Sequence, residues 1–180
     1  MIEQETIKLI RDVTVVLVPL GSLITLPKDT EVTITQSLGG TYTITTPGSM
    51  YRLESKDADA IGKKTNLVFT LAENENIALE DKIWNALRTC YDPEIPVNIV
   101  DLGLIYGIDI APNADNKSNV IIRMTLTAPG CGMGPIIAAD AKEKVLHLPG
   151  VNSVEIELIF DPPWDRSMMS DQAKLELGLF

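Results

Sequence analysis

One cysteine of this chain stands between glycines, in a loop where its thiol can take part in chemistry. Cys131 lies in the run TLTAPGCGMGP, residues 125–135, with Gly130 before it and Gly132 after it. Because Pro135 suits the first position of a helix, the run is expected to lead directly into one. The N–H groups and dipole at a helix start stabilise a thiolate, and glycine neighbours leave the sulfur accessible. Cys131 is therefore a candidate nucleophile or metal ligand. The alternative is that the glycines only permit a tight turn and that Cys131 is a small residue that packs there without a chemical role.

The other sulfur and nitrogen ligands of the chain restrict this chemistry. The only histidine, His147, lies near the far end of the predicted helix, about 20 Å from Cys131 at the rise of a helix. A cysteine–histidine hydrolase site within one subunit is therefore excluded. Cys90 is expected on the apolar face of another helix, as part of the core. Two cysteines and one histidine are fewer than the four ligands that structural zinc or a protein-ligated 4Fe–4S cluster needs, so no cluster is expected to be held stably by a monomer.

Carboxylates form a second group of candidates. Asp92, Glu94 and Asp101 lie among apolar residues and prolines in the run DPEIPVNIVDLGL, residues 92–104. Asp92 stands before a proline, where it can start a turn, and Asp101 can cap the bend that follows. For each of them a structural and a functional role stay open. Trp164, which follows two prolines, is either a lid beside the Cys131 loop or plain packing.

The elements that position these residues fall into two patterns. Up to about residue 70, β-branched or aromatic residues alternate with polar ones in about five short runs separated by glycine and proline turns. Such strands are expected to curl into a small barrel or sandwich. A polar connector follows, with one more strand expected at residues 66–71. We predict a β-rich domain at residues 1–72 and a second domain at residues 77–180.

The second domain mixes helices and strands. Apolar residues at helical spacing predict a helix from Leu79 that ends before Pro93. Two strands are expected at residues 104–111 and 120–126, then a helix from Pro135 to Leu148, a strand at residues 154–160 and a short helix at residues 170–178. The expected fold class is α+β.

Charge and hydropathy indicate which partners the protein is expected to bind and in which compartment it is expected to lie. The net charge is −10 and no run of basic residues is longer than Lys63–Lys64, so nucleic acid is not an expected partner. The N-terminal residues carry acids where a secretory signal carries lysines, and the apolar residues 13–26 are interrupted by Pro19 and Gly21. We expect a cytoplasmic protein with no membrane partner, in which both cysteines are thiols.

Four runs taken together resemble the SufT-type iron–sulfur assembly proteins, a family that also includes PaaD-like factors. The runs are DPEIPVNIVDLGLIYGIDI, TLTAPGCGMGP, LPGV and DPPWDRSMMSDQAKLELG. Residues 34–62 resemble the β-rich domain that SufT proteins carry ahead of the shared assembly domain. The resemblance implies an α+β assembly domain like that at the C-terminus of NifU-type scaffolds, and a non-enzymatic role in metal trafficking. It maps the family's acidic motif onto Asp92, Pro93 and Glu94, and its loop cysteine onto Cys131; many relatives have a proline where this chain has Gly132.

The expected function is that of an accessory factor in iron–sulfur cluster assembly or in the maturation of client proteins. Cys131, helped by Asp92 or Glu94, would contact iron, a transient cluster, or a partner that carries one. The expected partners are iron–sulfur scaffold proteins and apo client proteins, and a homodimer that shares a cluster through paired Cys131 thiolates remains open. Two alternatives stand beside this hypothesis. One is a thiol enzyme with Cys131 as nucleophile, and the other is a pure protein-interaction module.

Overall fold

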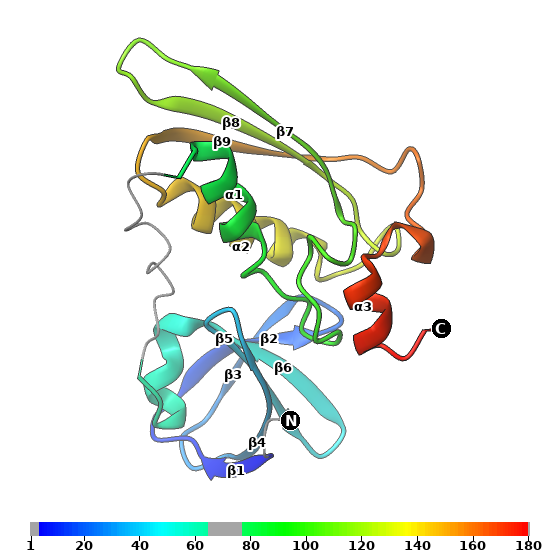
Figure 1. The fold of residues 1–180 in the computed structure, drawn as a ribbon. Helices are drawn as coiled ribbons and strands as arrows, with labels where there is room; N and C mark the ends of the chain where they lie inside the picture. Colours follow the sequence, from blue (N-terminus) through cyan, green and yellow to red (C-terminus); the bar gives the residue numbers. More distant parts are fainter. Residues whose placement is uncertain (1–3, 65–76, 180) are drawn as a thin grey trace. The chain divides into compact units, whose positions relative to one another are not determined.

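The computed structural model describes residues 4–64 and 77–179, and the chain divides into two compact units (Figure 1). The N-terminal unit consists of Met1–Phe69 together with Pro93–Pro96, and the C-terminal unit consists of Thr70–Asp92 and Val97–Phe180. Each unit is a mixture of strands with short helical segments, and the chain as a whole is α+β, as the sequence predicted.

The N-terminal unit is built on one antiparallel sheet. Its strands are β1 Glu5–Lys8, β2 Val13–Val18, β3 Ser22–Leu26, β4 Glu31–Leu38, β5 Thr41–Thr46 and β6 Ser49–Leu53. They follow the order β1-β4-β5-β6-β2-β3. The five predicted strands correspond to β2 through β6. The strand expected at residues 66–71 lies outside the described residues.

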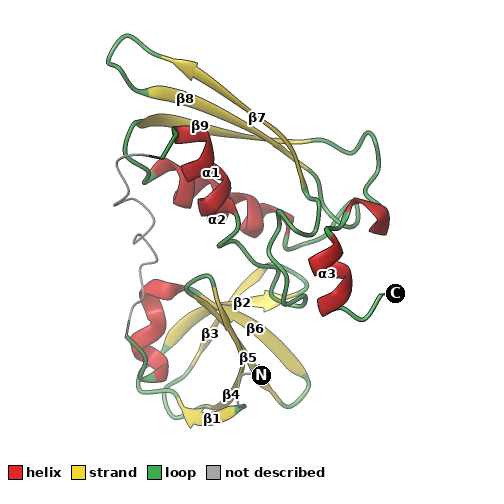
Figure 2. Ribbon diagram, in the orientation of Figure 1, coloured by secondary structure: helices red, strands yellow, loops and turns green. Residues whose placement is uncertain are grey.

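The sheet curls around a single core (Figure 2). Alternate residues of β2, β4, β5 and β6 belong to one buried cluster, with Ile44 and Leu53 inaccessible to solvent. A 3-10 helix, η1 at Ser55–Ile61, adds Ala58, Ala60 and Ile61 to the cluster. The sequence pattern predicted neither η1 nor β1, because η1 is mostly polar and β1 lacks the alternation of a half-buried strand.

The C-terminal unit is a three-stranded sheet with helices. Its elements are α1 Leu79–Leu87, β7 Ile105–Pro112, β8 Ser118–Met124, α2 Gly134–Leu146, β9 Val151–Leu158, a 3-10 turn η3 at Arg166–Met168 and α3 Asp171–Glu176. The sheet order is β7-β8-β9. Strands β7 and β8 are antiparallel, whereas β8 and β9 are parallel. Every element predicted after residue 77 is present. Helix α1 ends at Leu87, well before Pro93, and the ends of the other elements differ by up to three residues.

Helices α1 and α2 lie along one face of this sheet (Figure 2). The buried residues Val120, Ile122 and Met124 alternate along β8, which is the pattern of a strand with one covered face. Parallel strands cannot be joined by a tight turn, so the chain leaves β8 through a loop and returns to β9 through α2. No helix among residues 4–64 and 77–179 is long and apolar enough to cross a membrane.

We expect the two predicted domains, residues 1–72 and 77–180, to unfold independently. Leu53→Ala in the N-terminal core and Ile122→Ala in the C-terminal core each remove a side chain with no solvent exposure. Each change should cost about 2–5 kcal/mol of unfolding free energy, and only in the unit that carries it. Hydrogen exchange of the amides in each unit, measured as a function of denaturant concentration, gives the unfolding free energy of each unit separately. Equal loss of protection in both units from either change would contradict two independent cores.

Candidate functional site

Cys131 lies in the loop that leads from β8 into α2, here called the thiol loop, residues 125–133. The loop closes on itself through two backbone contacts: Cys131 N–H donates to the Ala128 carbonyl at 3.4 Å, and its own carbonyl accepts from Gly134 N–H at 3.0 Å. Gly130 has a φ of +79°, a left-handed conformation that favours glycine. The Cys131 side chain is partly exposed and forms no disulfide. The thiol is therefore accessible to a ligand or partner.

The ends of the thiol loop are held in the core while its tip is exposed. Thr125 is fully buried, and its N–H donates to the Leu104 carbonyl at 2.8 Å. Met133, also buried, is the N-cap residue of α2. Cys131 thus stands two residues ahead of the cap, close to the expected position. The Thr125 hydroxyl has no hydrogen-bond partner among the described residues, a feature that sequence reasoning missed because the run TLT resembles the end of an ordinary strand.

Asp92 and Glu94 lie in a second loop, here called the acidic loop, residues 92–97. A β-bridge between Tyr91 and Asn98 joins its two ends, and Ile99 N–H donates to the Cys90 carbonyl at 2.9 Å. The two carboxylates differ in environment, because Asp92 is 9% exposed whereas Glu94 is exposed. Asp92 therefore lies in a mostly buried environment, whereas Glu94 faces solvent.

The bend after the acidic loop is capped by Asn98. Its Oδ1 accepts hydrogen bonds from the N–H groups of Val100 and Asp101 at 3.0 and 2.9 Å. Its Nδ2 donates to the Asp101 carboxylate at 2.6 Å. The sequence suggested Asp101 as the cap of this bend; in the structure Asp101 orients the residue that caps it.

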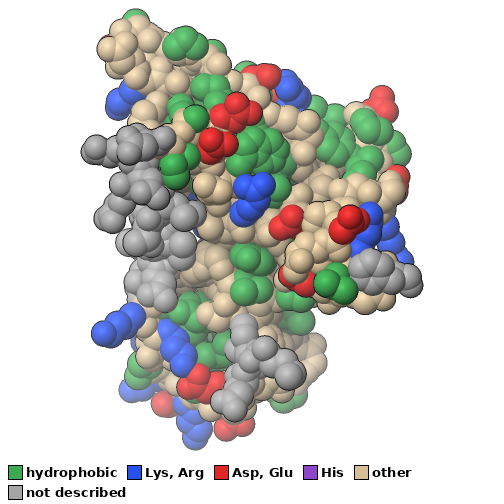
Figure 3. Space-filling view, viewed as in Figure 1, with side chains coloured by type: hydrophobic (Ala, Val, Ile, Leu, Met, Phe, Trp, Pro, Cys, Tyr) green, Lys and Arg blue, Asp and Glu red, His purple; other side chains and the backbone are tan. Residues whose placement is uncertain are grey.

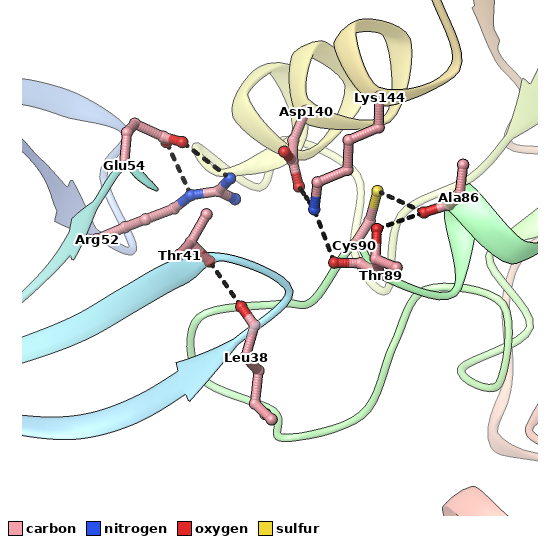
Figure 4. A network of polar contacts seen from close by, with 9 residues as sticks. All are labelled: Leu38, Thr41, Arg52, Glu54, Ala86, Thr89, Cys90, Asp140 and Lys144. Atoms are coloured by element: carbon pink, nitrogen blue, oxygen red, sulfur yellow. Dashed lines mark hydrogen bonds and ion pairs between the residues drawn. The ribbon is translucent and has the colours of Figure 1, made fainter. Parts of the chain in front are cut away.

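A lysine of α2 ties the end of α1 to the rest of the unit (Figure 4). The Lys144 ammonium donates to the Thr89 carbonyl at 2.7 Å and contacts Asp140 at 3.2 Å. A cation at this position also suits the negative end of the α1 dipole. Cys90 beside it is fully buried, and its thiol lies 3.8 Å from the Ala86 carbonyl. The segment that leads into the acidic loop is thus fixed before the loop begins.

The remaining candidates, His147 and Trp164, form hydrogen bonds to backbone carbonyls of their own unit. His147 is exposed at the C-cap of α2, with Nδ1 2.7 Å from the Glu143 carbonyl. Trp164 donates its indole N–H to the Leu102 carbonyl at 2.8 Å, so it packs on the chain that follows the acidic loop. On the face drawn in Figure 3, acidic and basic side chains are interspersed.

Side chains that can bind metals do not gather into groups of three or more in the described part of the chain. Over residues 4–64 and 77–179, no group of three or more His, Cys, Asp or Glu side chains is arranged to hold a metal ion. Cys131, Asp92 and Glu94 are all described, so they do not form such a group. What the chain offers is one accessible thiol and, on a separate loop, one exposed carboxylate.

Comparison with known proteins identifies the family. A model described as "Iron-sulfur cluster assembly protein" matches residues 80–158. A Fe-S protein maturation auxiliary factor of Porphyromonas gingivalis is 50% identical over 105 residues, which are 58% of this chain and 96% of the relative. This chain belongs to the iron–sulfur cluster assembly protein family. The predicted resemblance to SufT-type proteins is thereby confirmed.

Two further relatives also match this chain. The Fe-S protein maturation auxiliary factor SufT of Staphylococcus aureus is 39% identical over 88 residues, 49% of this chain and 96% of that protein. An iron-sulfur cluster carrier protein of Synechocystis is 30% identical over 93 residues, 52% of this chain but only 25% of the carrier. These names describe auxiliary and carrier factors, which agrees with a non-enzymatic role.

Cys131 should be the reactive thiol of the folded protein and Cys90 the inert one. Cys90 has no solvent exposure, so its modification requires local opening, which should make it about 100-fold slower or more. Alkylation of the native protein, with labelled positions determined by peptide mass, tests this. The Cys131→Ala variant, which keeps only the buried thiol, is the control. Faster labelling of Cys90, or labelling of both thiols only on unfolding, would contradict the assignment.

Proposed function

We propose that this protein is an accessory factor in the maturation of iron–sulfur proteins and that Cys131 contacts the iron or transient cluster being delivered. Family membership supports the general role. The observation that carries the specific proposal is the contrast between the two cysteines: Cys131 is partly exposed in a loop between glycines, whereas Cys90 is buried. Only the first can reach a cargo bound to another protein.

The small number of cysteine and histidine ligands in the chain implies that the cluster is cargo shared with a partner. A 4Fe–4S cluster requires about four thiolate or imidazole ligands, and the chain has two cysteines and one histidine. One of these cysteines is buried, and His147 lies at the far end of α2 from the thiol loop. The remaining ligands must come from a scaffold protein, an apo client or a second copy of this chain.

Transfer by this route is a ligand exchange without change of oxidation state. The bond between iron and the Cys131 sulfur breaks as a bond between iron and a client thiolate forms. The proton released by the client thiol is taken up by the Cys131 thiolate. A thiol that is accessible, but not enclosed by further ligands of its own chain, suits such an exchange because it binds without trapping the cargo.

The acidic loop has a complementary part in the proposal. Glu94, which is exposed, is assigned to contact with iron or with the partner that carries the cluster, because carboxylate oxygen is an iron ligand and a hydrogen-bond acceptor. Asp92 is assigned to maintain the conformation of the acidic loop, because Asp92 is nearly buried. It would help Cys131 only indirectly, through the conformation of this loop.

The assembly activity is assigned to the domain of residues 77–180, within which the family match falls. We propose that its fold is of the kind found at the C-terminus of NifU-type scaffolds, and that the reaction takes place in the cytoplasm, where thiols remain reduced.

Anaerobic transfer from a loaded scaffold to an apo client tests the role of the thiol. Cys131→Ser should lower the transfer rate about tenfold or more, as loss of a metal contact commonly does, and Glu94→Gln should lower it by a smaller factor. Cys90→Ala is the matched control and should transfer at the native rate if folded. Full activity of Cys131→Ala would favour a pure interaction module. Turnover of a small thiol-reactive substrate that Cys131→Ser abolishes would favour a thiol enzyme.

Reconstitution with iron and sulfide tests the sharing of the cluster. The monomer fraction should hold no stable 4Fe–4S cluster on its own cysteine and histidine residues, because they are too few. Any bound iron should follow the dimer fraction and disappear in Cys131→Ala. Native mass measurement and absorption, applied to separated monomer and dimer, measure both quantities. A stable cluster within one subunit on those ligands would overturn the proposal.

A further inference from the structure

The C-terminal segment, residues 161–179 and here called the strap, packs on the turn that follows the acidic loop. Two hydrogen bonds join them: Ser170 N–H donates to the Asp101 carbonyl and the Trp164 indole N–H donates to the Leu102 carbonyl, each at 2.8 Å. A third joins the strap to β7, where the Tyr106 hydroxyl donates to the Pro162 carbonyl at 2.7 Å. The strap contains η3 and α3 and is drawn in orange and red in Figure 1. It lies beyond residues 80–158, which the family model matches.

The turn is shaped to receive the strap. Gly103 has a φ of +74°, and a Cβ there would lie 2.7 Å from the carbonyl carbon of Met168 and 2.9 Å from its Cβ. The backbone of the strap thus occupies the space that any other side chain would need. Glycine is required at this position both by the left-handed conformation and by the close approach.

The same turn is one end of the acidic loop. Asn98 pairs with Tyr91 across the base of the loop and caps the turn through Val100 and Asp101. On the other side of the base, burial and the negative charges of Glu176 and Asp101 raise the pKa of Tyr91. Glu176 belongs to α3, so the strap lies near both ends of the acidic loop.

We propose that the strap is a positioning element that fixes the base of the acidic loop, the loop that carries Glu94. This inference rests on the proposed function only in the part that Glu94 has in transfer. Two of the hydrogen bonds of the strap are to backbone carbonyls of the turn, and the third joins the strap to Tyr106 of β7. None of these three bonds involves Asp92 or Glu94. Loss of the strap should therefore loosen the loop without removing any residue assigned to the cargo.

Gly103→Ala in the full-length chain detaches the strap, and Gly150→Ala is the matched control. Gly150 also has a left-handed φ, +89°, but a Cβ there meets nothing within 4 Å. Both variants carry the strain of alanine in a left-handed conformation, and only the first has the collision with Met168. Hydrogen exchange by NMR should show the amides of Ser170 and Ile99 exchanging about tenfold faster or more in Gly103→Ala than in Gly150→Ala.

Each outcome bears on the inference. Faster exchange at Ser170 with unchanged exchange at Ile99 would overturn it, because the strap would then be held by the turn without holding the loop. Equal effects of the two variants would also overturn it. If Gly103→Ala does not fold, Trp164→Phe, which removes one hydrogen bond of the strap, is compared with Trp84→Phe on α1. In that comparison the amide hydrogens of Ser170 and Ile99 should exchange faster in Trp164→Phe but not in Trp84→Phe.

A transfer assay separates this inference from the proposed function. If Gly103→Ala loosens the loop and slows transfer while Glu94→Gln slows it too, both are supported. If Glu94→Gln transfers at the native rate, the assigned role of the acidic loop fails, and the exchange data alone still decide whether the strap fixes its base. If Glu94→Gln slows transfer but Gly103→Ala, with a loosened loop, does not, the positioning role is overturned.

Discussion

The parallel pairing of β8 with β9 is the constraint on which the C-terminal unit depends. Parallel neighbours require a crossover, and here the crossover consists of the thiol loop and α2. The loop must leave the sheet at the end of β8 and start a helix that packs back on the same face. Its two ends, Thr125–Leu126 and Met133, are buried, whereas residues 128–130 between them are exposed and Cys131 is partly exposed. The exposure of Cys131 is thus a consequence of the topology.

The second loop is held by different means. The acidic loop has a hairpin-like base formed by Tyr91 and Asn98, and the chain enters it from the end of α1. Lys144 of α2 fixes that entry through the Thr89 carbonyl, so α2 both follows the thiol loop and anchors the segment before the acidic loop. One helix therefore follows the thiol loop directly and contacts the segment that precedes the acidic loop.

This arrangement fits a protein that handles a cluster without keeping it. A resident site surrounds its metal with a complete set of ligands, and release then requires several bonds to break. A single accessible thiol supplies one bond, which a client thiolate can replace. Under the proposed function, the small number of Cys and His ligands in one subunit is the property that suits a carrier or auxiliary factor.

Much of the fold was predictable because its signals are local. The period-two alternation identified β2 to β6, Pro135 marked the start of α2, and the glycines around Cys131 marked an accessible thiol. The motif residues also sufficed to recognise the family. Strand β1 and the helix η1 were not predicted, because their residues are buried or exposed according to what packs on them and not according to a local period.

The sequence by itself determined the residue types, the order of elements and the number of ligands, since these depend on neighbours along the chain and on simple counts. Only the tertiary structure decided that β9 pairs parallel to β8, that the strap lies against Gly103, and that Arg52, at 1% exposure, is buried beside Glu54 at 2.9 Å. It also shows no group of three or more His, Cys, Asp or Glu side chains arranged for a metal ion within residues 4–64 and 77–179. Such contacts join residues far apart in the chain or depend on what covers them, and a local pattern carries no information about either.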